Sequence, residues 1–144
     1  MPYNLTITIG LGEALDRLSI LNIKVLKIDD PEKKKVILSE RVKLEKSIED
    51  AGWGESTMWT LYTELKSVNQ TLWDVEDNIR ELDKECFDKP YPNGAVKICN
   101  CCERFMKLAR SVYYLNDQRY LLKSQIDLMS DGELREVKSY AQSS

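Results

Sequence analysis

Apolar residues recur at steps of three and four along most of the chain, and this spacing predicts four helices. Residues 11–28 carry a wide apolar face, whereas residues 31–50 carry only a thin apolar stripe on a mostly polar segment. Residues 56–87 and 95–129 are longer, and the first of these keeps a heptad-like apolar seam without interruption. We therefore expect a buried first helix, an outer second helix and two long helices that pack along each other.

The segment between the two long helices is the clearest break in the pattern. It holds Pro90, Pro92 and the dipeptide Asn93–Gly94, which are residue types that favour turns. A short connection between two helices of similar length favours an antiparallel hairpin. The expected fold class is therefore all-α: an up-down antiparallel helical bundle in which the two long helices form a hairpin.

The two ends of the chain follow different patterns. In residues 1–10 the apolar Leu5, Ile7 and Ile9 alternate with polar residues, which predicts a short extended segment. This segment is interpreted as a lone edge strand, as a strand that pairs with another chain, or as an arm lying across the helices. Residues 133–140 are expected to form a short C-terminal helix, and residues 1–144 together to form one helical domain.

Composition narrows the classes of protein and partner. The formal net charge of −3 and the pI near 5.1 argue against general nucleic-acid binding, which is typical of basic proteins. No apolar run reaches the length of a membrane span, and the N-terminal residues lack the pattern of a signal peptide. We expect no membrane association and a cytoplasmic location.

The chain contains no histidine, which excludes Ser–His and Cys–His nucleophile pairs and imidazole metal ligands. Four cysteines lie close together in the sequence. Their C-x-C-C run departs from the C-x-x-C spacing of zinc sites, so we interpret them as reduced cysteines on two facing helices. We expect no resident metal or cofactor; the weaker alternative is a metal site made by Cys86, Cys99, Cys101 and Cys102.

The last long helix carries the residue types that bind phosphate or carboxylate groups. Arg119 occupies an apolar position of the helical stripe, and Asn116 and Lys123 lie one turn to either side of it. Asp16 and Lys24 of the first helix are expected to meet this group. The candidate anion-binding residues are Lys24, Arg110, Asn116, Arg119 and Lys123.

A second cluster of charges lies in the stretch from Leu72 to Arg80. Counting residues through the hairpin loop places Arg110 opposite Glu76 and Asp77, and it places Arg119 roughly 15–20 Å away along the helix axis. Paired charges beside a helical seam fix the register of helices more than they add stability. We expect a register-setting polar network of Asp16, Glu76, Asp77 and Arg80, with Arg110 as the partner of the acids.

Several stretches of the chain resemble one family. They are residues 12–24, 68–69, 72–80, 108–113 and 136–140, together with Asn116, Asp117, Arg119 and Lys123. On these residues the chain resembles an uncharacterised family of bacterial and phage proteins, the domain of unknown function 6165. The resemblance spans nearly the whole chain but not the cysteine-containing loop, and the family name implies no activity, substrate or cofactor.

We expect a non-catalytic interaction or scaffold protein, and a homodimer, because the apolar surface exceeds what four helices need. The alternative is a small-anion protein that binds phosphate, a nucleotide or a sugar phosphate, or an enzyme that acts on phosphates with Mg²⁺ held by Asp16, Glu76 and Asp77. A further version of the enzyme alternative is an Arg/Lys cage around a rearranging dicarboxylate. The paired E-x-x-E and E-x-x-D spacing of helical nucleotide pyrophosphohydrolases is absent from the sequence.

Overall fold

The computed structural model describes residues 3–53, 56–87 and 100–130, and this part of the chain is all-α, as predicted. The helices are α1 (Leu11–Lys27), α2 (Pro31–Asp50), α3 (Ser56–Phe87) and α4 (Asn100–Met129). The expected bounds of the first three helices agree with the structure to within one residue. Residues 95–99, expected to open the fourth helix, and the helix expected at 133–140 lie outside the described residues.

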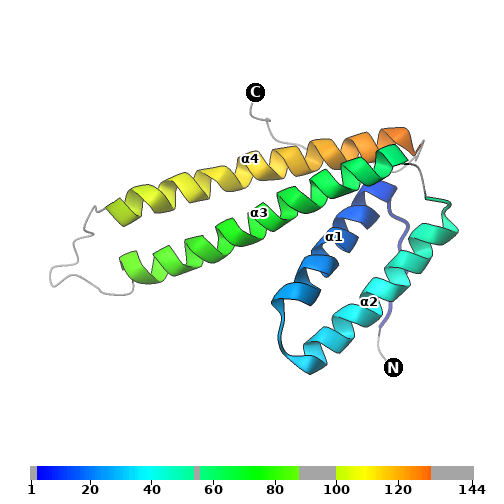
Figure 1. Ribbon diagram of the computed structural model, residues 1–144, viewed down its shortest axis with the longest axis horizontal. Helices are drawn as coiled ribbons and strands as arrows, with labels where there is room; N and C mark the ends of the chain where they lie inside the picture. Colours follow the sequence, from blue (N-terminus) through cyan, green and yellow to red (C-terminus); the bar gives the residue numbers. More distant parts are fainter. Residues whose placement is uncertain (1–2, 54–55, 88–99, 131–144) are drawn as a thin grey trace.

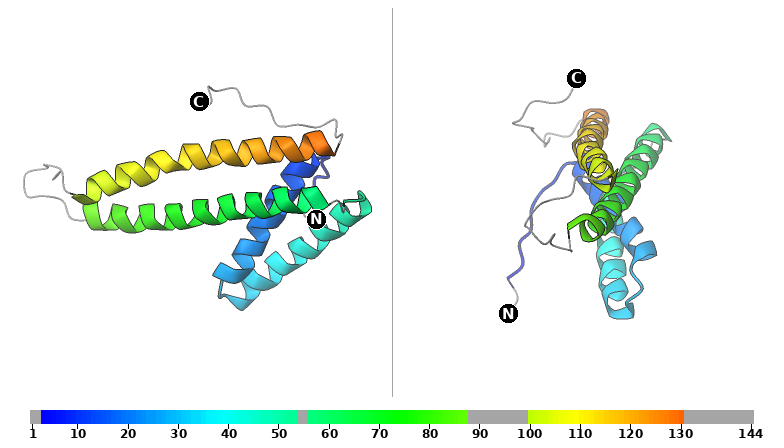
Figure 2. Two further views of the ribbon diagram at one scale, coloured as in Figure 1. Left: turned by 45° about the horizontal axis from the view of Figure 1, so that its top comes forward. Right: turned by 90° about the vertical axis from the view of Figure 1, so that its left-hand side faces the viewer.

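The four helices form two pairs that cross at one end of the molecule. Helices α3 and α4 run antiparallel and side by side along their whole length, which confirms the predicted hairpin (Figure 1). Helices α1 and α2 form a second pair set across one end of that hairpin, and both views in Figure 2 show the same arrangement. Helix α1 packs on all three other helices, whereas α2 packs only on α1 among the described helices. The prediction of an outer second helix is therefore confirmed.

Both ends of α2 are set by local signals in the sequence. The Asp30 side chain accepts hydrogen bonds from the backbone N–H groups of Glu32 (2.9 Å) and Lys33 (3.2 Å), and Pro31 opens the helix. At the other end Gly52 has φ of 82°, a left-handed conformation that suits glycine. The N–H groups of Gly52 and Trp53 bond back to the carbonyls of Glu49 and Ile48, which is the Schellman pattern of a helix C-terminus.

The hydrophobic core lies where α1 crosses the hairpin. Its buried residues are Ala14, Leu15, Leu18, Ile48, Tyr62, Leu65 and Ile126. The far half of the hairpin extends beyond α1 and α2, so among the described helices only α3 and α4 cover each other there (Figure 1). No helix of the described residues is long and apolar enough to cross a membrane.

The N-terminal residues 3–10 are extended, as the alternating pattern predicted, and they lie beside α1 and α2. Ile9 packs against the core, whereas Leu5 and Ile7 are 92% and 64% exposed. The described part of the chain contains no strand, so this segment is an arm against helices and not an edge strand.

Candidate functional site

Charged side chains of α1 and α4 meet where these two helices cross. The Arg119 guanidinium holds the Asp16 carboxylate with two hydrogen bonds, from Nε to Oδ1 (2.8 Å) and from Nη2 to Oδ2 (2.5 Å). One turn further along α4, the Lys123 Nζ donates to the Glu13 Oε2 at 2.6 Å and lies 4.0 Å from the Asp16 Oδ2. The Asp16–Arg119 pair is the two-pronged arrangement that planar Arg and carboxylate groups favour.

Helix α3 adds a third side to this cluster. The Asn69 Nδ2 donates to the Asp16 Oδ1 (2.9 Å) and to the Ser19 Oγ (2.7 Å), and the Ser19 Oγ donates to the Asp16 backbone carbonyl (2.7 Å). Asp16 is 1% exposed and Ser19 is fully buried. Burial of a carboxylate is tolerated when its oxygens are paired and hydrogen-bonded. Asp16 therefore joins α1 to both helices of the hairpin.

The N-terminus of α1 is held by the same face of α4. Gly10, the residue before the helix, provides no side-chain cap, and instead the Asp127 Oδ1 accepts a hydrogen bond from the Gly12 N–H at 2.7 Å. A carboxylate at this end also complements the positive end of the helix dipole. Gly12 lies directly against the α4 backbone, where a Cβ atom would overlap the Lys123 carbonyl oxygen. These contacts fix where α1 crosses α4.

The charges at this crossing are matched by the chain itself. Among the described residues, Arg119 and Lys123 face the carboxylates of Glu13, Asp16 and Asp127, and Arg17 also pairs with Glu13. The crossing is therefore no basic pocket, and an incoming anion would have to displace carboxylates that are already bound.

Glu13 shows the balance of forces at the edge of the cluster. Burial acts to raise the pKa of the Glu13 carboxyl, but the hydrogen bonds and charges of Lys123 and Arg17 outweigh burial and hold the pKa below its ordinary value of 4.5. A group whose pKa is lowered by folding stabilises the fold above its unfolded pKa and loses that contribution as the pH falls through the folded value.

We expect Glu13→Gln to be less stable than the natural protein at pH 7 and the difference to shrink below pH 4.5. Urea unfolding of both proteins at pH 7, 5 and 4 measures this difference. A difference that stays constant across this range, or grows toward acid, would contradict the assigned role of the Glu13 carboxylate.

The structure brings together part of the predicted anion-binding set. Arg119, Lys123 and Asp16 meet as expected, and the Arg119 Nη1 also approaches the Asn116 Oδ1 at 3.4 Å. Lys24 does not join them; it lies two turns further along α1, beside α2. Asp16 and Lys24 are eight residues apart, and the helical twist over that distance turns Lys24 away from α4.

The prediction for the stretch from Leu72 to Arg80 was partly wrong. Arg80 pairs with Glu76 and Asp77 at 3.4 Å each, but all three side chains are more than half exposed, so they form a solvated ladder on α3. Asp16 is not part of that ladder because it bonds to Asn69, two turns away on α3. Arg110 does not reach the acids either; its Nη2 donates to the Tyr114 Oη on its own helix at 3.2 Å.

The cysteines give a further correction. Cys86 is half-buried and disulfide-bonded, whereas we expected reduced cysteines. A sulfur in a disulfide is no thiolate, so Cys86 cannot serve as a ligand in the four-cysteine metal alternative. Cys99 and the side chain of Cys101 lie outside the described residues, and Cys102 is half-buried. Within the described part of the chain, no three His, Cys, Asp or Glu side chains are grouped so that they could hold a metal ion.

Five residues of the crossing were missing from the predicted sites: Gly12, Glu13, Ser19, Asn69 and Asp127. The sequence carried a signal for some of them. Asn69 follows Leu65 by four residues and precedes Leu72 by three, so a polar side chain stands on the apolar seam. Arg119, Lys123 and Asp127 follow one another at steps of four, which marks a polar stripe on one face of α4.

Comparison with known proteins adds no further assignment. No family model, curated protein or solved structure matches the chain. The resemblance to the domain of unknown function 6165 therefore stays a prediction.

Proposed function

We propose that the protein is a non-catalytic interaction or scaffold protein whose buried polar cluster holds two helical pairs in one fixed orientation. The observation that carries this proposal is the Asp16–Arg119 pair, in which a carboxylate that is 1% exposed is bound by a guanidinium and by Asn69. Buried pairs of this kind are best known for setting register and orientation. The crossing of α1 over the hairpin is the feature that such a pair would specify.

The small-anion alternative is less favourable on energetic grounds. A ligand that recruited Arg119 would leave the Asp16 carboxylate buried without its main partner, at a cost of about 3–5 kcal/mol. That cost is comparable to the whole binding free energy of a millimolar ligand, about 4 kcal/mol. The Mg²⁺ alternative loses its ligand set, because Glu76 and Asp77 lie on an exposed face away from Asp16.

We expect inorganic phosphate, nucleotides, sugar phosphates and MgCl₂ to leave the melting temperature of the protein unchanged. Differential scanning fluorimetry with each compound measures this, and sodium chloride at the same ionic strength controls for screening. Stabilisation by a phosphate compound in the natural protein that disappears in Arg119→Met would contradict the proposal and support the anion alternative.

We also propose that the scaffold is a homodimer formed through the outer face of α4. The support is a row of exposed apolar residues at seven-residue steps, Tyr114, Leu121 and Leu128, which are 40%, 52% and 56% exposed. Such a row is the spacing of a helix–helix seam. A second layer of helices on the open side of a two-helix hairpin would also bury apolar surface that is otherwise in water.

We expect light scattering at micromolar concentration to give twice the chain mass of 16.7 kDa. Leu121→Lys should give the monomer mass, because it places a charge in the middle of the seam. Val42→Lys, a substitution of an exposed apolar residue on α2, is the matched control and should stay dimeric. A natural protein of monomer mass would contradict the dimer.

A further inference from the structure

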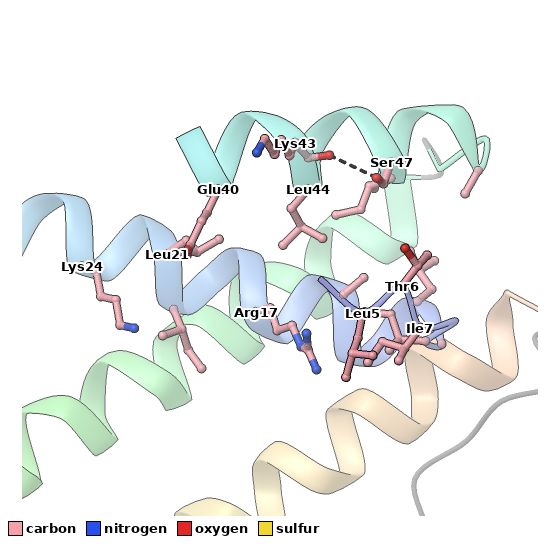
Figure 3. A pocket seen from close by; sticks show the side chains of 17 residues that line it. Leu5, Thr6, Ile7, Arg17, Leu21, Lys24, Glu40, Lys43, Leu44 and Ser47 are labelled. Atoms are coloured by element: carbon pink, nitrogen blue, oxygen red, sulfur yellow. Dashed lines mark hydrogen bonds between the residues drawn. The ribbon is translucent and has the colours of Figure 1, made fainter. Parts of the chain in front are cut away.

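A trough of about 1000 Å³ lies between α1 and α2, on the face along which the N-terminal arm runs (Figure 3). Its walls are aliphatic: Leu21 comes from α1, Leu44 and Ile48 come from α2, and Leu5 and Ile7 come from the arm. The arm closes one end of the trough without filling it, because its Leu5 and Ile7 side chains remain largely exposed. Asp16, Arg119 and Lys123 of the crossing do not line the trough, and among the described residues the two regions meet at Arg17, which pairs with Glu13.

The dimensions of the trough favour one kind of occupant. Its lining on α1 runs from Leu11 to Lys24. At 1.5 Å per residue this is roughly 20 Å, so the mean cross-section of the trough is roughly 50 Å². An α-helix with side chains has a diameter of 10–12 Å and a cross-section of roughly 80–110 Å². The trough therefore accommodates roughly half of the cross-section of a helix over three to four turns, with the apolar face of the helix buried and its polar face in water.

The charges around the trough favour an acidic occupant. Three cations line it, Arg17 and Lys24 from α1 and Lys43 from α2, against a single carboxylate, Glu40 (Figure 3). Among the described residues, Lys24 and Lys43 have no ion-pair partner, and Arg17 shares Glu13 with Lys123. Complementary charge at the rim of an apolar groove steers and selects a partner.

We propose that this trough is a docking site for an amphipathic α-helix of a partner protein, with aliphatic residues on its inner face and acidic residues along its flanks. Helices of this type dock in grooves through apolar side chains spaced at i, i+3, i+4 and i+7. The inference rests on the proposed function as an interaction protein and assigns the surface and the chemistry of the partner. A second copy of the chain is not the expected occupant, because its acidic stretch, Asp74 to Glu85, lies on α3, whose apolar face is buried against α4.

The test uses three designed peptides of about 14 residues. The first two have the same pattern of leucines, and the third has the same composition as the first. The first has the leucine stripe with glutamate at the flanking positions. The second has lysine in place of each glutamate, and the third has the composition of the first in an order that breaks the stripe. We expect only the first to shift the backbone amide NMR signals of residues lining the trough, among them Leu21, Lys24 and Leu44.

Charge reversal in the trough tests the assignment of its rim. Lys24→Glu combined with Lys43→Glu should weaken binding of the glutamate peptide at least about tenfold, because two favourable charges become repulsive. The same variant should now bind the lysine peptide. Lys35→Glu combined with Lys46→Glu makes the same change of net charge on exposed residues outside the trough, and it should bind the glutamate peptide as the natural protein does.

Four outcomes would overturn the inference. They are no binding of the glutamate peptide, equal binding of the glutamate and lysine peptides, amide shifts from dodecanoate but not from the peptide, and a Lys24→Glu, Lys43→Glu variant that loses self-association in sedimentation velocity. The last two would assign the trough to an acyl chain or to a second copy. These readouts test the face between α1 and α2. The proposed function is tested separately, because stabilisation by a phosphate compound that disappears in Arg119→Met would contradict it. The failure of one proposal can therefore be distinguished from the failure of the other.

Discussion

Arg119→Met is expected to lower the free energy of unfolding by about 3 kcal/mol. This value is the lower end of the range of costs for removing one partner of a buried ion pair. The substitution leaves the Asp16 carboxylate buried with Asn69 as its one side-chain hydrogen-bond donor among the described residues. Lys123 at 4.0 Å from the Asp16 Oδ2 offsets part of the loss, which is why the upper end of the range is not expected. Urea unfolding followed by far-UV circular dichroism measures the change.

Arg80→Met is the matched control for this experiment. Arg80 also pairs with two carboxylates, those of Glu76 and Asp77, but its side chain is 67% exposed and its partners are on the same helix. Exposed ion pairs of this type contribute about 0–1 kcal/mol. Equal losses in Arg119→Met and Arg80→Met would show that burial of the Asp16–Arg119 pair has no special effect on stability.

Gly12→Ala is expected to destabilise the protein by about 2–3 kcal/mol, at the upper end of the cost of overpacking. The added Cβ would overlap the Lys123 carbonyl oxygen and would lie 3.0 Å from the Asp127 Oδ1, so α1 would have to move away from α4. That movement would also lengthen the hydrogen bond from the Gly12 N–H to Asp127. The free energy of unfolding of the variant measures the cost.

The sign of this effect is what decides between packing and helix propensity. Replacing glycine by alanine in a helix ordinarily stabilises it by roughly 0.5–1 kcal/mol. Ser67→Ala, at an exposed position of α3, is the control for propensity alone and should change stability by less than about 0.5 kcal/mol. A Gly12→Ala variant that is more stable than the natural protein would contradict the close contact between α1 and α4.

The helices themselves were predictable because their signals are local. The polar breaks at Asp30–Pro31 and at Gly52 set the ends of α2, and the structure realises them as an Asp cap and a left-handed glycine. The seam from Met58 to Leu82 required a long partner, and α4 is that partner. Fold class and hairpin therefore follow from spacing and turn chemistry.

The crossing of α1 over the hairpin was not predictable in the same way. Which residues of α1 and α4 meet depends on how two helices far apart in the sequence approach each other. Asp16 and Arg119 are 103 residues apart, and Gly12 and Asp127 are 115 apart. Apolar periodicity describes one helix at a time, so it indicated that Asp16, Arg119 and Lys123 share a side of the bundle but missed Asn69 and Asp127. Counting residues through the hairpin loop linked the exposed Glu76 and Asp77 to Arg110, but each of these side chains has a nearer partner on its own helix.

The most direct test of the joint between the two helical pairs is a double-mutant cycle on Asp16 and Arg119. Unfolding free energies are measured for the natural protein, Asp16→Leu, Arg119→Met and the double variant. We expect each single variant to be destabilised and the double variant to recover much of the loss, because two apolar side chains can replace a buried pair. The coupling free energy should be about 2–3 kcal/mol, in the upper part of the range for residues that share a network. Single costs that simply add, with a coupling near zero, would contradict the claim that this buried pair joins α1 to the hairpin.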